Sequence, residues 1–161
     1  MPIQLTPARP YIVIASQLRE VIKDYPDQNL LLLGKVQWSD DQVYKACELI
    51  VSKFNVMPPY TSYTPQGVPE VLRYTILCGT AALLFAGEAA LQLRNRATAQ
   101  DGDVAPAGIF DKHSEYLQAC DYFKNEFEQG ARGWKTQVNA EACFGGFSSG
   151  YVTRRIRRRT L

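Results

Sequence analysis

The stretch PEVLRYTILCGTAALLFAGEAALQLRNRA, residues 69–97, decides the fold, because it offers about 28 residues to one uninterrupted helix. Pro69 is favourable at the first helical position. With a rise of about 1.5 Å per residue, the helix would be about 42 Å long. Its apolar side chains point to several sides: Val71, Tyr74, Cys78, Ala81, Phe85 and Ala89 to one, and Leu72, Ile76, Leu83, Leu84 and Leu91 to others. We therefore predict a central helix with neighbours packed all round it.

The preceding stretch, WSDDQVYKACELIVSKFNVMPP (residues 38–59), predicts a shorter amphipathic helix. Ser39 is a good N-cap, and Gln42 three residues later completes a capping box. Apolar residues then recur at helical spacing: Val43, Ala46, Cys47, Ile50 and Phe54. The Pro58–Pro59 pair must end the helix.

A second long helix is expected after the turn AQDGDVAPAG (residues 99–108), beginning near Phe110 or Asp111. Apolar and aromatic residues follow in steps of four and three: Tyr116, Cys120, Phe123, Phe127, Ala131, Trp134, Val138 and Ala142. The apolar spacing continues through Gly130 and Gly133, which favours one long helix. If this helix bends, we expect the bend at these two glycines. The glycine-serine stretch CFGGFSSG (residues 143–150) then predicts a hinge.

The N-terminal part gives weaker signals. Pro2, Pro7 and Pro10 favour an extended arm over residues 1–15, followed by a short helix capped by Ser16 and ending before Pro26. The run NLLLLGK (residues 29–35) fits either the end of a helix or a short buried strand.

These elements predict a mainly α fold. We expect an elongated helical bundle, with two long antiparallel helices, one or two shorter helices, an extended N-terminal arm and a C-terminal tail. A chain of 161 residues fits one domain, here residues 1–150, followed by a tail over residues 151–161.

The tail YVTRRIRRRTL (residues 151–161) is strongly basic. Without its five arginines the chain has 13 basic against 16 acidic residues, so the charge is concentrated at this end. Three interpretations are open: a solubilising end, a protein-docking arm, or a contact to DNA phosphates. The candidate contact residues are Tyr151, Arg154, Arg155, Ile156, Arg157, Arg158 and Arg159. Tyr60 and Tyr63 suggest a second contact, an adhesive loop, although a turn that packs its own aromatics fits equally well.

The sequence indicates neither an enzyme nor a cofactor or metal site. His113 is the single histidine, and the GxSxG elbow, the phosphate-binding loop and the ExxH pair are all absent. Cys47, Cys78, Cys120 and Cys143 form no CxxC pair, so we expect reduced core thiols. The apolar run over residues 75–87 is too short to span a bilayer, so we expect no membrane partner.

Residues 38–59 resemble the early helix of the head–tail adaptor (connector, head-completion) proteins of tailed bacteriophages. The resemblance lies in Trp38, the SDDQ cap at residues 39–42, Phe54–Asn55 and Pro58–Pro59. It extends in layout to about residue 150, through the long alanine-rich helix, the Asp101–Gly102 loop and the last helix.

The resemblance implies a structural virion protein at the head–tail interface, present in the host cytoplasm during assembly. Such proteins form a usually twelvefold ring of identical subunits that binds the portal protein, extends the DNA channel and receives tail or neck proteins. In this setting the arginine tail would be a docking arm, and contact with the passing DNA is the less favoured choice. The alternative function is a small helical nucleic-acid-binding protein that uses the same tail.

Overall fold

The computed structural model describes residues 10–29, 32, 34–99 and 112–144. Four helices hold most of them: α1 (Pro10–Ile22), α2 (Asp40–Val56), α3 (Glu70–Ala99) and α4 (His113–Phe144). No strand occurs in these ranges. The predicted mainly α fold is therefore confirmed.

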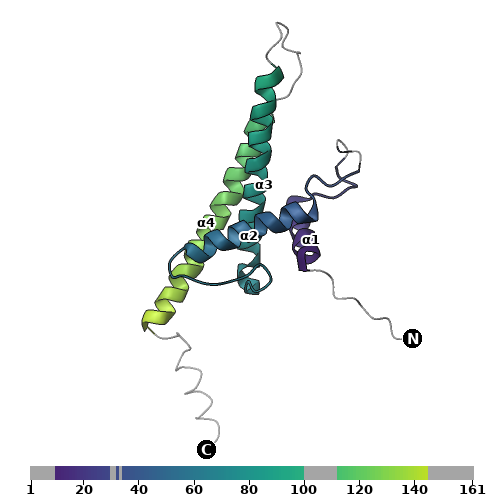
Figure 1. Cartoon of the computed structure of the whole chain (residues 1–161). Coiled ribbons are helices and arrows are strands. Elements are labelled where there is room, and N and C mark those ends of the chain that lie inside the picture. The colour runs from purple at the N-terminus through teal and green to yellow at the C-terminus, as the bar shows by residue number, and fades with distance from the viewer. Residues whose placement is uncertain (1–9, 30–31, 33, 100–111, 145–161) are drawn as a thin grey trace, which may run out of the picture.

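α3 and α4 form the long axis of the molecule. They run side by side as an antiparallel hairpin, and α2 crosses the hairpin while α1 packs against α2 and α3 (Figure 1). With 30 and 32 residues, the two long helices extend over about 45 Å and 48 Å. The shorter helices therefore cover only part of the hairpin, and the rest stands clear of them.

The start of α2 follows the predicted capping box. The Gln42 backbone N–H donates to the Ser39 hydroxyl oxygen (3.3 Å), and the Ser39 backbone N–H donates to the Gln42 side-chain oxygen (2.9 Å). Trp38, just before the cap, is buried with its ring edge-on to Phe85 of α3, with 5.3 Å between the ring centroids. The cap thus fixes both the first turn of α2 and its attachment to the hairpin.

The first helix begins earlier than predicted. α1 starts at Pro10, so the expected extended arm is wrong for residues 10–15, and residues 1–9 lie outside the described part. Ser16 is not an N-cap, because its hydroxyl donates to the Val13 carbonyl inside the helix (2.9 Å). The physical reason is packing: Ile14, Ala15 and Leu18 form a buried face against the core, and a proline fits a first helical turn.

The connection from α1 to α2 is organised by a buried carboxylate. Asp24 is almost fully buried, and its two oxygens accept hydrogen bonds from the Asn29 amide, the Gln37 backbone N–H (2.8 Å) and the Trp38 backbone N–H (3.3 Å). Within NLLLLGK, the described residues form turns, and Leu32 is exposed. Neither predicted alternative, a helix end or a buried strand, fits these residues.

The core is centred where α2, α3 and α4 meet, at Gly79 of α3. A Cβ atom there would lie 2.7 Å from Ile50 Cγ2 of α2 and 2.8 Å from the Phe127 ring of α4. Gly130 of α4 makes a second close approach, since a Cβ there would lie 2.6 Å from the Thr75 hydroxyl oxygen. These two glycines let the long helices approach closely, and α4 continues unbroken through Gly130 and Gly133.

Packing all round α3 is confirmed only for residues 76–82, which are all buried. On either side of that segment, the helix exposes apolar residues: Val71, Tyr74, Leu83, Leu91 and Leu93. The prediction was wrong for these positions because α1 and α2 are too short to cover the whole helix.

The cysteines are free thiols, but they are not all in the core as predicted. Cys47 and Cys78 are buried, Cys120 is half-buried and Cys143 is exposed near the end of α4. The last turns of α4 extend beyond the core, and residues 141–144 are all exposed, so the described elements do not cover the apolar stretch that contains Cys143.

The Glu70–Arg94 part of α3 is long and apolar enough to cross a membrane, judged by length and composition alone. The core helix of a soluble protein passes the same test, and the middle of this stretch is packed against α2 and α4. The expected absence of a membrane partner stays a prediction.

Candidate docking surfaces

The loop between α2 and α3 is held in one conformation by Asn55. Its side-chain oxygen accepts hydrogen bonds from the Thr61 hydroxyl (2.9 Å) and the Tyr63 backbone N–H (3.0 Å). Its amide nitrogen donates to the Tyr63 carbonyl (2.8 Å). The loop contains a cis peptide bond between Pro58 and Pro59. One side chain at the end of α2 thus fixes the loop at Thr61 and Tyr63.

Lys135 of α4 also holds this loop, through hydrogen bonds from its ammonium group. Only 3% of this residue is exposed, and burial lowers the pKa of its ammonium group. The ammonium donates to the Pro59 carbonyl (2.7 Å) and to the Thr61 hydroxyl oxygen (2.9 Å), and lies 4.3 Å from the centre of the Phe54 ring. These contacts replace much of the lost hydration, so the loop is tied to α2 and α4 together.

The two loop tyrosines have different environments. Tyr63 is half-buried and packs on Phe54, with ring centroids 6.2 Å apart, as expected for a turn that packs its own aromatics. Tyr60 is 79% exposed and projects from the fixed loop. The structure therefore does not bring the two rings together as one adhesive patch, and Tyr60 alone remains free to contact a partner.

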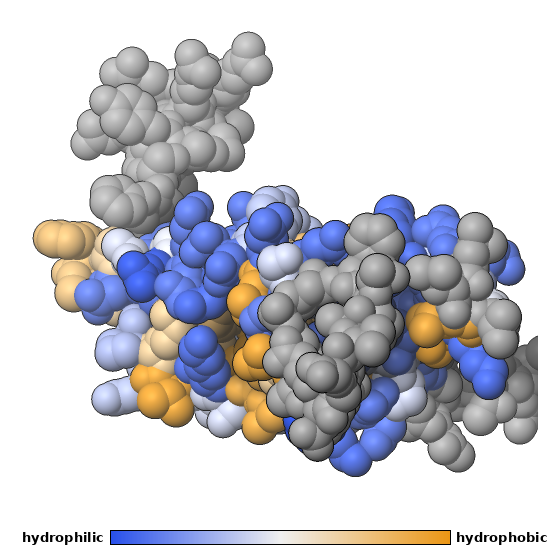
Figure 2. Space-filling model, turned by 90° about the horizontal axis from the view of Figure 1, so that it is seen from above, coloured by the Kyte–Doolittle hydropathy of each residue, from blue (hydrophilic) through white to orange (hydrophobic). Residues whose placement is uncertain are grey.

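A second candidate surface lies on α3, above the level that α1 and α2 cover. Leu83, Gly87, Ala90 and Leu91 are all exposed and follow one another at helical spacing, and we call them the α3 outer row. Ile76, seven residues before Leu83 and so on the same side of the helix, is buried. The α3 outer row therefore continues the face of α3 that is buried at Ile76 into the part of the helix that α1 and α2 do not cover. Figure 2 shows apolar side chains reaching the surface in separate patches among hydrophilic ones.

The α3 outer row has open space at Gly87 among the described residues. A Cβ atom added at Gly87 would meet no atom within 4 Å. Small residues between two leucines allow another helix to approach closely, which is a common way for helices to pack. This face suits contact with another protein chain.

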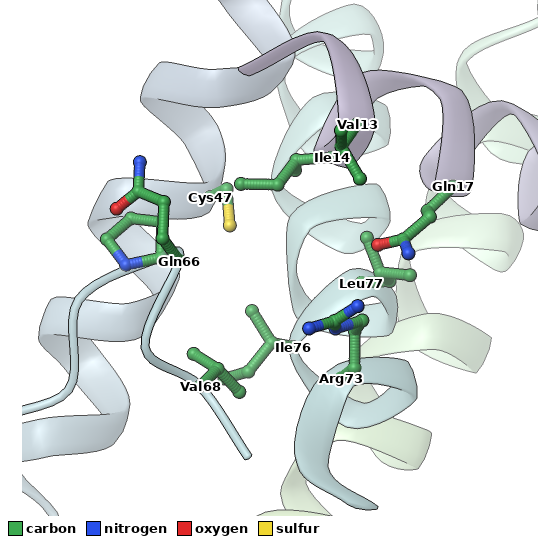
Figure 3. Close-up of a pocket in the computed structure, with 10 residues that line it drawn as sticks. Val13, Ile14, Gln17, Cys47, Gln66, Val68, Arg73, Ile76 and Leu77 are labelled. Atoms are coloured by element: carbon green, nitrogen blue, oxygen red, sulfur yellow. The ribbon is translucent and has the colours of Figure 1, made fainter. Parts of the chain in front are cut away.

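The third candidate surface is a cavity of about 290 Å³ between α1, α3 and the loop before α3, which we call the α1–α3 cavity. Its apolar wall comes from Val13, Ile14, Val68, Ile76 and Leu77. Arg73, Gln17 and Gln66 place polar groups around it, as Figure 3 shows. Cys47 also reaches the wall, and burial raises the pKa of its thiol to about 11, so the thiol stays protonated at neutral pH.

The predicted contact residues of the C-terminal tail lie outside the described residues: Tyr151, Arg154, Arg155, Ile156, Arg157, Arg158 and Arg159. Within the described ranges, no group of three or more metal-ligating side chains comes together. The ring nitrogen Nδ1 of His113 is hydrogen-bonded to the Ala89 carbonyl oxygen (2.8 Å), which joins the start of α4 to α3.

Sequence reasoning missed Lys135 and the cavity. Phe127, Ala131 and Lys135 are spaced four residues apart and are all buried, so helical periodicity alone would have placed the lysine inside. Because lysine is charged, we would expect Lys135 to be exposed, and it was not counted with the buried positions. The cavity gathers residues from α1, α2, α3 and a loop, so no local pattern predicts it.

No protein-family model, curated protein or solved structure matches the chain. The residues and surfaces described above therefore carry the functional assignment on their own.

Proposed function

We propose that this protein is a subunit of the ring that joins the portal of a tailed-bacteriophage head to the tail. The observation that carries the proposal is the α3 outer row, where an apolar face of the long helical hairpin extends beyond the part that α1 and α2 cover. Exposed leucines that share one helix face with small residues, as Leu83 and Leu91 do, are typical of a surface that contacts another protein. Lateral packing between identical subunits would bury them.

The fixed loop supports a platform role. Tyr60 projects from a segment that is held by Asn55 and Lys135, so it would bind a partner without a large loss of conformational entropy. An aromatic side chain on a rigid support is typical of residues that dominate protein interfaces. We assign this contact to the portal or to a neck protein.

The arginine tail supplies the remaining contact of the proposal. Guanidinium groups form paired hydrogen bonds with carboxylates, so Arg154 to Arg159 would bind an acidic groove on the portal or on the adjacent subunit. Firm binding to DNA inside the channel would oppose genome ejection, and for this reason we favour a protein partner.

The direct test is reconstitution with the portal protein that this chain is proposed to join. Electron microscopy of the mixture should show a ring added to the portal particle. Leu83→Glu combined with Leu91→Glu should prevent the ring, because charges would be buried between subunits. Leu49→Glu is the matched control, since Leu49 is 63% exposed on α2 and outside the row. If the double variant assembles as well as the control, the α3 outer row is not a subunit contact.

The tail is tested separately by deleting residues 153–161. Helicity measured by circular dichroism should be unchanged, while attachment to the portal should weaken, and attachment of the full chain should weaken with added salt. A truncated protein that joins the portal normally, together with a tail peptide that binds duplex DNA with a steep salt dependence, would favour the nucleic-acid alternative. Persistent failure of the full chain to bind any portal or tail protein would refute the adaptor function.

A further inference from the structure

The α1–α3 cavity has the chemistry of a binding site that is incomplete. Its volume of about 290 Å³ exceeds by roughly a factor of two the 150 Å³ of an engineered apolar cavity that binds benzene. Apolar residues form most of the wall, and the side chains of Arg73 and Gln17 extend toward the open space (Figure 3). An apolar wall with a few converging polar groups is typical of a ligand pocket.

Arg73 indicates the charge of the missing ligand. The residue is half-buried, and it forms no hydrogen bond or ion pair with any residue in the described ranges. A guanidinium group that is partly withdrawn from water, and that lacks a counterion, is stabilised when a carboxylate binds to it. The expected occupant therefore carries a carboxylate next to an aliphatic or aromatic side chain.

We propose that the α1–α3 cavity of one copy binds the segment between α3 and α4, residues 100–111, of a second copy. This segment, QDGDVAPAGIFD, contains Asp101, Asp103 and Asp111, with no lysine or arginine. It also offers Val104, Ile109 and Phe110 to an apolar wall. The terminal segments do not fit, because residues 1–9 and 145–161 contain arginine and no acidic residue. They would repel Arg73.

The contact must form between copies, because the segment cannot reach the cavity of its own chain. The cavity residue Ile76 and the end of α3 at Ala99 are separated by about 23 helical residues, or about 35 Å. The acidic residues of the connection lie near its two ends. Asp103 is four residues beyond Ala99, so it can return at most about 14 Å of the 35 Å. Asp111 is two residues before His113, whose ring contacts the Ala89 carbonyl about 20 Å from Ile76, and two residues extend only about 7 Å. Each carboxylate falls short by more than about 10 Å, which excludes the intramolecular salt bridge.

Because the cavity and the segment are different surfaces, one contact leaves a free cavity on one copy and a free segment on the other. The contact then either repeats from copy to copy until a rotation closes a ring, or is made twice across a two-fold axis in a pair. It does not depend on the adaptor proposal, since free copies without a portal are sufficient to form it. Failure of one proposal can therefore be distinguished from failure of the other.

The experiment uses the full chain and a fluorescent peptide covering residues 98–113. Fluorescence anisotropy should show the peptide binding to the wild type, and sedimentation equilibrium should show self-association of the chain. Arg73→Glu should weaken both by at least about tenfold, the loss expected for one charge-assisted pair. Arg132→Glu is the matched control with the same charge change: Arg132 is exposed on α4 and contacts only Glu128 (3.3 Å) among the described residues.

A charge exchange makes the test specific. A peptide with Asp101→Lys and Asp103→Lys should lose binding to the wild type and recover it with the Arg73→Glu chain. Circular dichroism confirms that the variant chain is folded. The proposal is overturned if the wild type does not bind the peptide, or if Arg73→Glu binds it as tightly as the wild type does. It is also overturned if octanoate binds while the peptide does not, because the occupant is then a small carboxylic acid.

Discussion

The close approach at Gly79 allows a stability prediction from two distances. In Gly79→Ala the new methyl group would lie 2.7 Å from Ile50 Cγ2 and 2.8 Å from the Phe127 ring. Carbon atoms pack without strain at about 3.5–4.0 Å, so the neighbours must retreat by about 1 Å. The first contact is a methyl group on the branched Cβ of Ile50 and the second is a ring carbon of Phe127, so neither is the far end of a flexible side chain that could move away easily.

The magnitude is the difference of two opposing effects. Overpacking a core by one methyl group costs about 1–3 kcal/mol. Replacing glycine by alanine inside a helix stabilises it by about 0.5–1 kcal/mol. We therefore expect Gly79→Ala to lower the free energy of unfolding by about 0–2.5 kcal/mol. In a protein of this size, each kcal/mol corresponds to a fall in Tm of about 2–4 °C.

Gly87→Ala is the matched control, since it is the same substitution in the same helix. A Cβ atom there meets nothing within 4 Å, so there is no overpacking cost. Only the gain from replacing glycine by alanine in a helix remains, and the free energy of unfolding should rise by about 0.5–1 kcal/mol. Urea unfolding of both variants followed by circular dichroism measures the difference. Equal stability of the two variants would show that α2, α3 and α4 do not meet closely at Gly79, and the core described above would be wrong.

Three further outcomes follow from the structure. Ser39→Ala should lower the free energy of unfolding by about 1 kcal/mol, measured by urea unfolding, because it removes the N-cap of α2. Burial lowers the pKa of Lys135, so with rising pH the folded state loses this proton before the unfolded chain does. The stability of the wild type relative to Lys135→Met should therefore rise as the pH increases toward the ordinary lysine pKa of 10.5, with Lys124→Met at an exposed position of the same helix as the matched control. A thiol reagent at neutral pH should modify exposed Cys143 quickly and Cys47 only after unfolding, since burial keeps the Cys47 thiol protonated; rapid modification of Cys47 would contradict the packing.

Local signals were enough to predict most of the helices. The Ser39–Gln42 box and the Pro58–Pro59 pair determine the ends of α2 through contacts within a few residues, so the sequence contains the necessary information. The last helix was predicted for the same reason, because its apolar phase continues through Gly130 without a break. Both predictions depended on periodicity rather than on tertiary contacts.

Errors arose where tertiary contacts override local preference. Pro10 has the conformation of either an extended arm or a first helical turn, and the burial of Leu18 against the core favours the helix. Cys143 lies in an apolar, helix-like stretch of sequence, but α4 extends beyond the elements that would cover it. Of the candidate site, the sequence indicated Tyr60 as a contact, but it did not reveal the α3 outer row or the cavity, which depend on where α1 and α2 end.

The partial cover of the hairpin has a consequence for its local opening. Beyond the stacked rings of Phe85 and Phe123 (5.7 Å apart), the described side chains of α3 include only one buried residue, Ala89. Amide hydrogen exchange should therefore be slowest in residues 76–82 and become progressively faster toward the tip, where few contacts oppose fraying. The hairpin would then combine a base that unfolds only with the whole domain and a tip that opens on its own, able to adjust to a neighbour without disturbing the core.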